Sequence, residues 1–365
     1  MKRLGHLFES VCAWSNLWQA AIAARRGKRR RTNVAEFEFD RERQLLTLRD
    51  RLLNGTYRPG PYRSFRIYEP KARLISAAAY PDRVVHHAIC QVIEPIWERV
   101  FIEHSYACRR GKGSLAAMHR AYRLGKSHQF VLKCDIQQFF PSVDHQVLMT
   151  QLRRKLKDPS LLQLLQTIIA TRFPGQKTAR FFPGDDLLTQ LERPCGLPLG
   201  NQTSQFFGNV MLNPLDHFVT QHLRCCSYVR YADDFLVFGH NKTELHRIRA
   251  AIAEFLLDFR LRIHPHKSVV FPVRSGLPFL GYRLFPTHIE LAKRHLQRLR
   301  KRLRLFERDY HAGQRTDTEI LLSLQSWWGY AMHAHCRTVV HQIFADFPFI
   351  AEIRKATQPE AHEPR

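Results

Sequence analysis

Residues 227–238 read Ser-Tyr-Val-Arg-Tyr-Ala-Asp-Asp-Phe-Leu-Val-Phe. Strand-forming residues run from Ser227 to Arg230 and again from Phe235 to Phe238, which predicts two strands joined by a turn at Tyr231-Ala232-Asp233-Asp234. Adjacent carboxylates repel each other unless a cation neutralises them, so this turn is a candidate metal site. By itself the turn is equally typical of a solvated Asp-Asp turn, and a further carboxylate is needed to decide.

A third carboxylate follows another strand-like segment. Asp135 comes directly after the run Phe130–Cys134, which predicts a buried strand with an acid at its end. In-line phosphoryl transfer with two Mg²⁺ ions needs carboxylates brought together, with one ion on the attacking oxygen and one on the leaving oxygen. The candidate catalytic residues and metal ligands are therefore Asp135, Asp233 and Asp234.

The charge balance points to a polyanionic partner. The chain has 57 Lys and Arg against 32 Asp and Glu, a formal net charge of +25, which exceeds what solubility needs and favours nucleic acid. With 365 residues and 44% hydrophobic residues, the chain can form several subdomains. No apolar run approaches a membrane span and no secretory signal is recognisable at the start, so we expect no membrane partner. Eight cysteines without CxxC spacing are typical of free thiols in the cytoplasm.

Periodicity along the chain predicts alternating helical and extended segments. The basic run 25–31 is an expected phosphate-contacting arm, and Ser64–Tyr68 with Arg73–Ser76 predicts an antiparallel hairpin with a basic tip. A glycine-rich loop at 196–200 precedes a helix and lets backbone approach a ligand closely. Helical patterns cover 37–53, 82–101, 114–124, two segments between 143 and 172, 243–259, 291–308 and 319–344, whereas 261–273 reads as extended and 357–365 as a frayed tail.

The order of these motifs resembles a known enzyme family. A strand ending in Asp135, a loop and helix at Leu197–Phe207, the Asp233-Asp234 turn, a segment with Lys267 and the stretch Gly276–Tyr282 together resemble reverse transcriptases of the bacterial group II intron, retron and diversity-generating type. The resemblance covers roughly residues 65–282 and implies an α+β right-hand polymerase with an antiparallel palm sheet and a helical thumb. The implied organisation is an N-terminal helical and basic extension at 1–60, fingers at 61–130, a palm at 131–285 with a fingers insertion at about 146–195, a thumb at 286–350 and a flexible tail at 351–365.

One departure narrows the resemblance to a subtype. Leu199-Gly200 stands where intron-type enzymes carry Gln-Gly. The stretch 199–205 consists of an apolar residue, Gly, three further residues and Ser-Gln, and this order is similar to the signature of reverse transcriptases from diversity-generating retroelements. The stretches 82–88 and 105–113 are also similar to that group. The two signature motifs expected of a retron enzyme are missing, and no zinc-ligand cluster or endonuclease segment follows the expected thumb.

The resemblance also implies roles for individual residues. Asp135 and Asp233 would be the principal metal ligands, with the backbone of Ile136 and the supporting carboxylate of Asp234. Phe140 matches an aromatic gate against the ribose 2′-hydroxyl, although core packing beside Phe139 is the alternative. Residues implied at the nucleotide are Lys71, Arg73, Phe140, Leu199, Gly200, Gln205 and Lys267, and those implied at primer or template are Tyr231, Gly276, Leu280, Gly281, Lys293, Arg294 and Arg298.

The implied activity is RNA-directed DNA synthesis from dNTPs on a template RNA, through a cDNA/RNA hybrid, with two Mg²⁺ ions and Mn²⁺ as a substitute. The subtype implies miscopying at template adenines and a small basic accessory protein. One alternative is a reverse transcriptase of an intron, a retron-like element or a phage-defence system. The other is a non-catalytic RNA-binding protein on a polymerase scaffold, against which the intact carboxylates weigh because a chain without metal gains nothing from clustering them.

Overall fold

The computed structural model describes residues 3–68, 72–171, 180–186 and 188–357. These residues form helices and three sheets, in which β1–β2, β4–β5, β7–β8 and β8–β9 pair antiparallel, so the predicted α+β class is confirmed. The chain divides into two compact units. One comprises residues 1–117, 132–237 and 243–269, and the other comprises 118–131, 238–242 and 270–365. This division differs from the predicted boundaries, since the segments 118–131 and 270–285 group with the C-terminal helices.

A four-stranded sheet carries the predicted catalytic segments. Its strand order is β4 (Tyr228–Tyr231), β5 (Asp234–Gly239), β3 (Phe130–Asp135) and β6 (Val269–Pro272). The strands β4 and β5 are antiparallel, and Tyr231 is opposite Asp234 at their closed end, as the sequence pattern predicts. The predicted extended segment 261–273 is strand only over β6, because turns interrupt it between Ile263 and Ser268.

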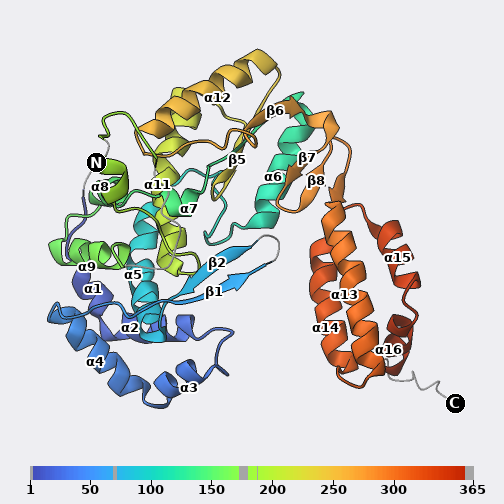
Figure 1. The fold of residues 1–365 in the computed structure, drawn as a ribbon, viewed down its shortest axis with the longest axis horizontal. Helices are drawn as coiled ribbons and strands as arrows, with labels where there is room; N and C mark the ends of the chain where they lie inside the picture. Colours follow the sequence, from blue (N-terminus) through green and yellow to red (C-terminus); the bar gives the residue numbers. More distant parts are fainter. Residues whose placement is uncertain (1–2, 69–71, 172–179, 187, 358–365) are drawn as a thin grey trace. The chain divides into compact units, whose positions relative to one another are not determined.

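Helices of the first unit pack around this sheet and around one another. The long helix α5 (Tyr80–Glu98) packs against α2 (Trp14–Ala24) and α11 (Gln202–His217), and its apolar positions, among them Val84, Val85 and Ile89, are fully buried (Figure 1). The predicted helix 37–53 is divided at Asp40 into α3 and α4. The remaining elements are α1 (Phe8–Cys12), α3 (Thr32–Phe39), α4 (Arg41–Leu53), α7 (Phe139–Ser142), α8 (His145–Arg153), α9 (Pro159–Ile169), α10 (Thr189–Glu192), a π-helical turn (Phe218–His222) and α12 (Lys242–Leu257).

The predicted hairpin before α5 is present. Strands β1 (Arg63–Ile67) and β2 (Arg73–Ala77) pair antiparallel, with Ile67 opposite Arg73 at the tip (Figure 1). Lys71, which the resemblance implies at the triphosphate, lies outside the described residues. Arg73 is described and exposed, at the first position of β2.

The second unit combines a small sheet with a helical bundle. Strands β7 (Leu277–Phe279), β8 (Tyr282–Leu284) and β9 (Ile289–Leu291) form an antiparallel sheet, and α6 (Ser114–Ser127) lies largely within this unit. The bundle consists of α13 (Lys293–His311), α14 (Asp317–Ala331), α15 (Arg337–Ala345) and α16 (Phe349–Thr357) (Figure 1). Its core contains Leu299, Leu303, Phe306, Ile320, Leu324, Ile343, Phe347, Phe349, Ile350 and Ile353.

Two predictions for this bundle were wrong. The pattern at 319–344 is not one helix, because the chain turns at residues 332–336, where His335 exchanges hydrogen bonds with the backbone of Ile289. The tail does not begin at residue 351, since α16 continues to Thr357 and Ile353 is fully buried in the core. In both cases tertiary packing decides the boundary.

Within the described residues, no helix combines the length and the apolar character that crossing a membrane requires. All eight cysteines are described and are free thiols.

The imidazole of His86 on α5 gives a prediction about acid stability. It is 1% exposed, neither ring nitrogen has a hydrogen-bond partner in the part of the chain that the structure describes, and burial lowers its pKa to about 3. The unfolded chain therefore binds a proton below about pH 6.5 that the folded chain does not bind, and stability falls as the pH falls from there. Compared with His86→Leu, the wild type should lose about 2 kcal/mol more unfolding free energy between pH 7.5 and pH 5. Urea titrations at both pH values measure this difference, and equal losses would contradict it.

Candidate active site

The turn between β4 and β5 presents two adjacent carboxylates. Ala232 has φ 54°, in the left-handed region that non-glycine residues seldom adopt, and Asp233 follows it. Asp234 begins β5. Side chains alternate between the two faces of a strand, and the turn reverses the direction of the chain. The carboxylates of Asp233 and Asp234 therefore do not lie side by side on one face of the hairpin.

The end of β3 is bonded to this turn through the backbone. The N–H of Ile136 donates to the carbonyl of Asp233 at 3.2 Å, and the carbonyl of Asp135 accepts from the N–H of His264 at 2.7 Å. The structure therefore brings together Asp135, Ile136, Asp233 and Asp234, as predicted from residues about 100 positions apart in the sequence.

Two lysines neutralise part of this cluster. Lys267 Nζ lies 3.2 Å from Asp135 Oδ1, which brings the predicted basic residue to the candidate catalytic carboxylates. Lys133 Nζ lies 3.3 Å from Asp234 Oδ2 and was not predicted as a site residue. Its signal was a lysine inside the otherwise apolar run 130–134, since a charge in a half-buried strand needs a partner.

Burial dominates the electrostatics of the turn. It raises the pKa of the Asp234 carboxyl to about 6, although the charge of Lys133 acts in the opposite direction. Burial also raises the pKa of Asp233, and the charge of Asp135 adds to this while Arg73 and Lys267 oppose it. A cluster of this kind is stabilised by added positive charge.

The donor set fits divalent cations, which enzymes of this fold family use. Carboxylate oxygens are the ligands that Mg²⁺ and similar hard cations prefer, and Asp234 Oδ1 is a buried oxygen with no hydrogen-bond partner among the described residues. As the side chains stand, no group of three or more Asp, Glu, His or Cys residues in the described part of the chain is arranged to hold a metal. Two of these carboxylates, those of Asp135 and Asp234, are each paired with a lysine ammonium group.

The glycine loop is bonded to the β1–β2 hairpin. The carbonyl of Leu199 accepts from the N–H of Ser76 at 3.0 Å, which fixes the backbone of Leu199 beside β2. Gly200 has φ 117°, and a Cβ there would come 3.0 Å from Ile75 Cγ2, so both conformation and space favour glycine. The side chain of Leu199 is half-buried, and Arg73 is close enough for its charge to influence Asp233.

Phe140 lies next to α11, and Gln205 is a residue of α11. The half-buried ring of Phe140 packs edge-on against Phe139 with centroids 5.2 Å apart, and a Cβ on Gly208 would lie 3.7 Å from it. The exposed Gln205 accepts a hydrogen bond from Cys108 Sγ at 3.3 Å, which connects it to the 105–113 loop. Tyr231 is half-buried at the end of β4.

The second unit holds the residues implied to contact primer and duplex. Gly276 (φ 84°) and Gly281 (φ 90°) are buried, and a Cβ on Gly281 would collide with Tyr330 Oη. Leu280 also has a positive φ, 49°, and its carbonyl accepts from Tyr330 Oη at 3.3 Å. These contacts give the β7–β8 turn one rigid conformation.

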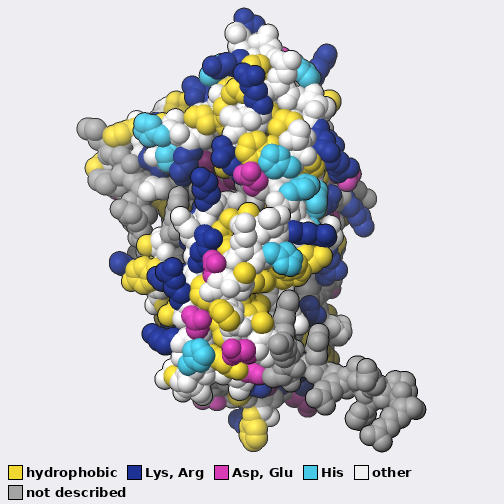
Figure 2. Space-filling model, turned by 90° about the vertical axis from the view of Figure 1, so that its right-hand side faces the viewer, with side chains coloured by type: hydrophobic (Ala, Val, Ile, Leu, Met, Phe, Trp, Pro, Cys, Tyr) yellow, Lys and Arg dark blue, Asp and Glu magenta, His cyan; other side chains and the backbone are white. Residues whose placement is uncertain are grey.

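The helix α13 has a strongly basic outer surface. Its Leu299, Leu303 and Phe306 face the bundle core, and most of its other positions are basic residues. Exposed or half-buried at this surface are Lys293, Arg294, Arg298, Arg300, Lys301, Arg302, Arg304 and Arg308. On the face drawn in Figure 2, Lys and Arg side chains are spread widely and Asp and Glu are scattered among them.

Comparison with known proteins places this geometry in a family. A family model described as reverse transcriptase (RNA-dependent DNA polymerase) matches residues 67–284. Protein YkfC of Escherichia coli (strain K12) is 28% identical over 287 residues, 66% of this chain and 71% of that protein. Group II intron-encoded protein LtrA of Lactococcus lactis subsp. cremoris is 25% identical over 173 residues, 47% of this chain and 27% of that protein.

Among solved structures, that of apo telomerase from Candida tropicalis, truncated from its C-terminal domain, aligns with a TM-score of 0.47 at 11% identity, over 67% of this chain and 59% of that chain. The family match covers β2, the carboxylates at the ends of β3 and β4, and the strands β7 and β8. The chain belongs to the reverse transcriptase (RNA-dependent DNA polymerase) family.

Proposed function

We propose that this chain copies a template RNA into cDNA at Asp135, Asp233 and Asp234, as the reverse transcriptase of a diversity-generating retroelement. The observation that supports catalysis is the backbone connection from Ile136 to Asp233, which joins the end of β3 to the Asp-Asp turn. The buried, unpartnered oxygen of Asp234 supports cation binding at this place. A scaffold that only binds RNA would have no use for a buried cluster of acids.

Asp135 and Asp233, with the Ile136 backbone and the Asp234 carboxylate, would hold two divalent cations, Mg²⁺ or Mn²⁺. Bound cations supply positive charge at the primer 3′-hydroxyl and at the triphosphate of the incoming dNTP. Lys267, now paired with Asp135, is then available as counter-ion or proton donor for the departing pyrophosphate. Lys133 keeps the Asp234 carboxylate oriented through the ion pair between them.

The remaining residue roles belong to the same proposal. The β1–β2 hairpin with Lys71 and Arg73 acts as fingers, with Phe140, Leu199, Gly200 and Gln205 around the nucleotide, and the helices α13–α16 act as the thumb. Tyr231, Gly276, Leu280 and Gly281 contact the primer, and Lys293, Arg294 and Arg298 contact the duplex backbone. A small basic accessory protein and a cytoplasmic location complete the proposal.

Leu199 supports the diversity-generating subtype. Its backbone is held by Ser76, so a glutamine at this position would keep the same backbone and change only the side chain. If the glutamine of intron-type enzymes makes a polar contact near the new base pair, leucine at this position removes that contact. One such contact is worth on the order of 1 kcal/mol, so its loss lowers the discrimination against incorrect nucleotides several-fold.

Leu199→Gln is expected to lower misincorporation several-fold, most visibly opposite template adenine, at a modest cost in rate. Deep sequencing of cDNA made from one RNA template, with Mg²⁺ constant and any required accessory protein present, measures this. Phe140→Ala is the matched contrast, because it should admit ribonucleotides without changing the base error spectrum. Accurate copying of adenines by the wild type would contradict the diversity-generating role, and equal adenine error in wild type and Leu199→Gln would contradict only the role of Leu199.

A second candidate is a reverse transcriptase of an intron, a retron-like element or a phage-defence system. The similarity to an intron-encoded protein over 47% of the chain favours it. It predicts an even error spectrum across the four template bases, so the same sequencing experiment separates the two.

A further inference from the structure

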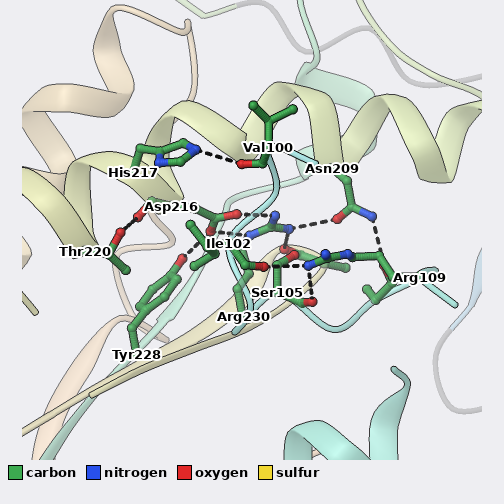
Figure 3. Close-up of polar contacts among 12 residues, drawn as sticks. Val100, Ile102, Ser105, Arg109, Asn209, Asp216, His217, Thr220, Tyr228 and Arg230 are labelled. Carbon is green, nitrogen blue, oxygen red and sulfur yellow. Dashed lines mark hydrogen bonds and ion pairs between the residues drawn. The ribbon is translucent and has the colours of Figure 1, made fainter. Parts of the chain in front are cut away.

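Arg230, the residue before the catalytic Tyr231-Ala232-Asp233-Asp234 turn, is completely buried. Its side chain is 0% exposed and forms an ion pair with Asp216 of α11, also 0% exposed. Nε donates to Asp216 Oδ1 and Nη2 donates to Asp216 Oδ2, both at 2.6 Å, which is the bidentate geometry of the strongest arginine contacts (Figure 3). Tyr228 Oη donates to Asp216 Oδ1 at 2.9 Å.

The remaining nitrogen of this guanidinium reaches the turn. Nη1 donates to Asn209 Oδ1 at 3.0 Å and to the carbonyl oxygen of Ala232 at 3.1 Å. Asn209 is fixed in turn, because its Nδ2 donates to the carbonyl of Ala107 at 2.8 Å. Figure 3 shows the guanidinium lying between Asp216 and Asn209, both of which come from α11.

This contact acts on a strained part of the backbone. Ala232 has φ 54°, a conformation that costs an L-residue energy and persists only when its surroundings hold it. The turn is held at two successive carbonyls, that of Ala232 by Arg230 and that of Asp233 by the N–H of Ile136. The direction of the Asp233 side chain follows from the orientation of these two peptide groups.

We propose that Arg230 is a positioning residue, which couples Asp216 and Asn209 of α11 to the Ala232 carbonyl and thereby aims the Asp233 carboxylate for catalysis. The guanidinium is planar and its N–H donors have fixed directions, so it can donate to the Asp216 carboxylate and to the Ala232 carbonyl at the same time. The compact ammonium group of a lysine could not reach both acceptors. A buried ion pair of this kind can often be replaced by apolar residues without loss of stability, so packing alone does not require the pair.

The test uses the double variant Arg230→Met with Asp216→Leu, which removes both buried charges and keeps the volume similar. The expected result is a folded protein with wild-type RNA affinity, a kcat for primer extension at least about tenfold lower and a KM for dNTP within about twofold of wild type. Binding of Mn²⁺ to the protein alone, followed by the electron paramagnetic resonance signal of free Mn²⁺, should weaken toward that of Asp233→Asn. Wild-type kcat and Mn²⁺ binding in the folded double variant would overturn the proposal.

A matched pair of single variants covers the case in which the double variant does not fold. Tyr228→Phe removes one buried hydrogen bond from the network, and Asn209→Ala removes two, from Arg230 Nη1 and to the carbonyl of Ala107, but only Asn209 bonds the nitrogen that holds Ala232. Asn209→Ala should lower kcat and Mn²⁺ affinity several-fold and Tyr228→Phe by less than about twofold, whereas equal effects would overturn the proposal.

The inference rests on the proposed polymerase activity. An inactive wild type would contradict that activity, while the Mn²⁺ measurement still tests the positioning of Asp233.

Discussion

Asp233→Asn is expected to lower the rate of RNA-templated DNA synthesis by about a thousandfold or more. The substitution keeps the shape of the side chain but removes a negative charge that faces the cation site, and loss of such a ligand removes several kcal/mol of transition-state stabilisation. Asp135→Asn should have a comparable effect, because the two carboxylates act together next to the Ile136 to Asp233 backbone contact. Single-turnover primer extension with saturating primer–template measures the rate.

The matched control is Asp50→Asn, the same substitution at an exposed acid of α4. Its rate should lie within about twofold of wild type, because an exposed charge far from the reacting atoms contributes little. RNA affinity and thermal unfolding of Asp233→Asn should stay close to wild type. Extension by Asp233→Asn at nearly the wild-type rate would show that this turn is not the catalytic centre.

Binding of RNA or of an RNA/DNA hybrid is expected to weaken about a thousandfold between 50 and 200 mM salt. If the basic surfaces neutralise roughly six phosphates, the slope of log affinity against log salt is about −5. The net charge of +25 and the row of exposed arginines and lysines on α13 are the observations behind this number. Fluorescence anisotropy with a labelled hybrid measures the slope.

Charge-removing variants identify which residues make these contacts. The triple variant Lys293→Gln, Arg294→Gln and Arg298→Gln should make the slope shallower by about 2 to 3, since each lost phosphate contact removes about 0.9. Replacing Arg43, which is exposed on α4, by glutamine serves as the control for loss of one charge elsewhere. A nearly flat salt titration of the wild type, or an unchanged slope in the triple variant, would contradict phosphate binding by α13.

The turn between β4 and β5 could be predicted because its signals are local. Strand-forming residues on both sides of Asp233-Asp234 and an acid after the run 130–134 are visible within a dozen residues, and the backbone contact between these strand ends confirms that they meet. The two strands are separated by only a short turn in the sequence, so Tyr231 and Asp234 are expected to pair where the strands meet. The β1–β2 hairpin was predictable for the same reason.

The support of the turn could not be predicted in this way. Arg230 and Asp216 are 14 residues apart and Arg230 and Asn209 are 21 apart, and among 57 basic and 32 acidic residues the sequence offers many possible partners. A signal was present, since an arginine inside an apolar strand and an aspartate inside an apolar helix each need a buried partner. Only the packing of α11 against the sheet shows that they are partners of each other.

Helix ends in the C-terminal bundle illustrate a second limit. No proline or glycine marks the break at residues 332–336, where contacts of His335 with β9 end the helix, and Ile353 extends the core into the segment expected to be a tail. Contacts of this kind depend on residues that are distant in the sequence, so periodicity alone does not reveal them.

The most direct test is primer extension by the purified wild type on a defined RNA template with a DNA primer, dNTPs and Mg²⁺, beside Asp233→Asn and a reaction with excess chelator. The account predicts full-length cDNA whose sequence follows the template in the wild-type reaction and none in the other two. Full-length cDNA from Asp233→Asn, or none from a folded wild type that binds the hybrid, would contradict RNA-directed DNA synthesis at the Asp135, Asp233 and Asp234 site.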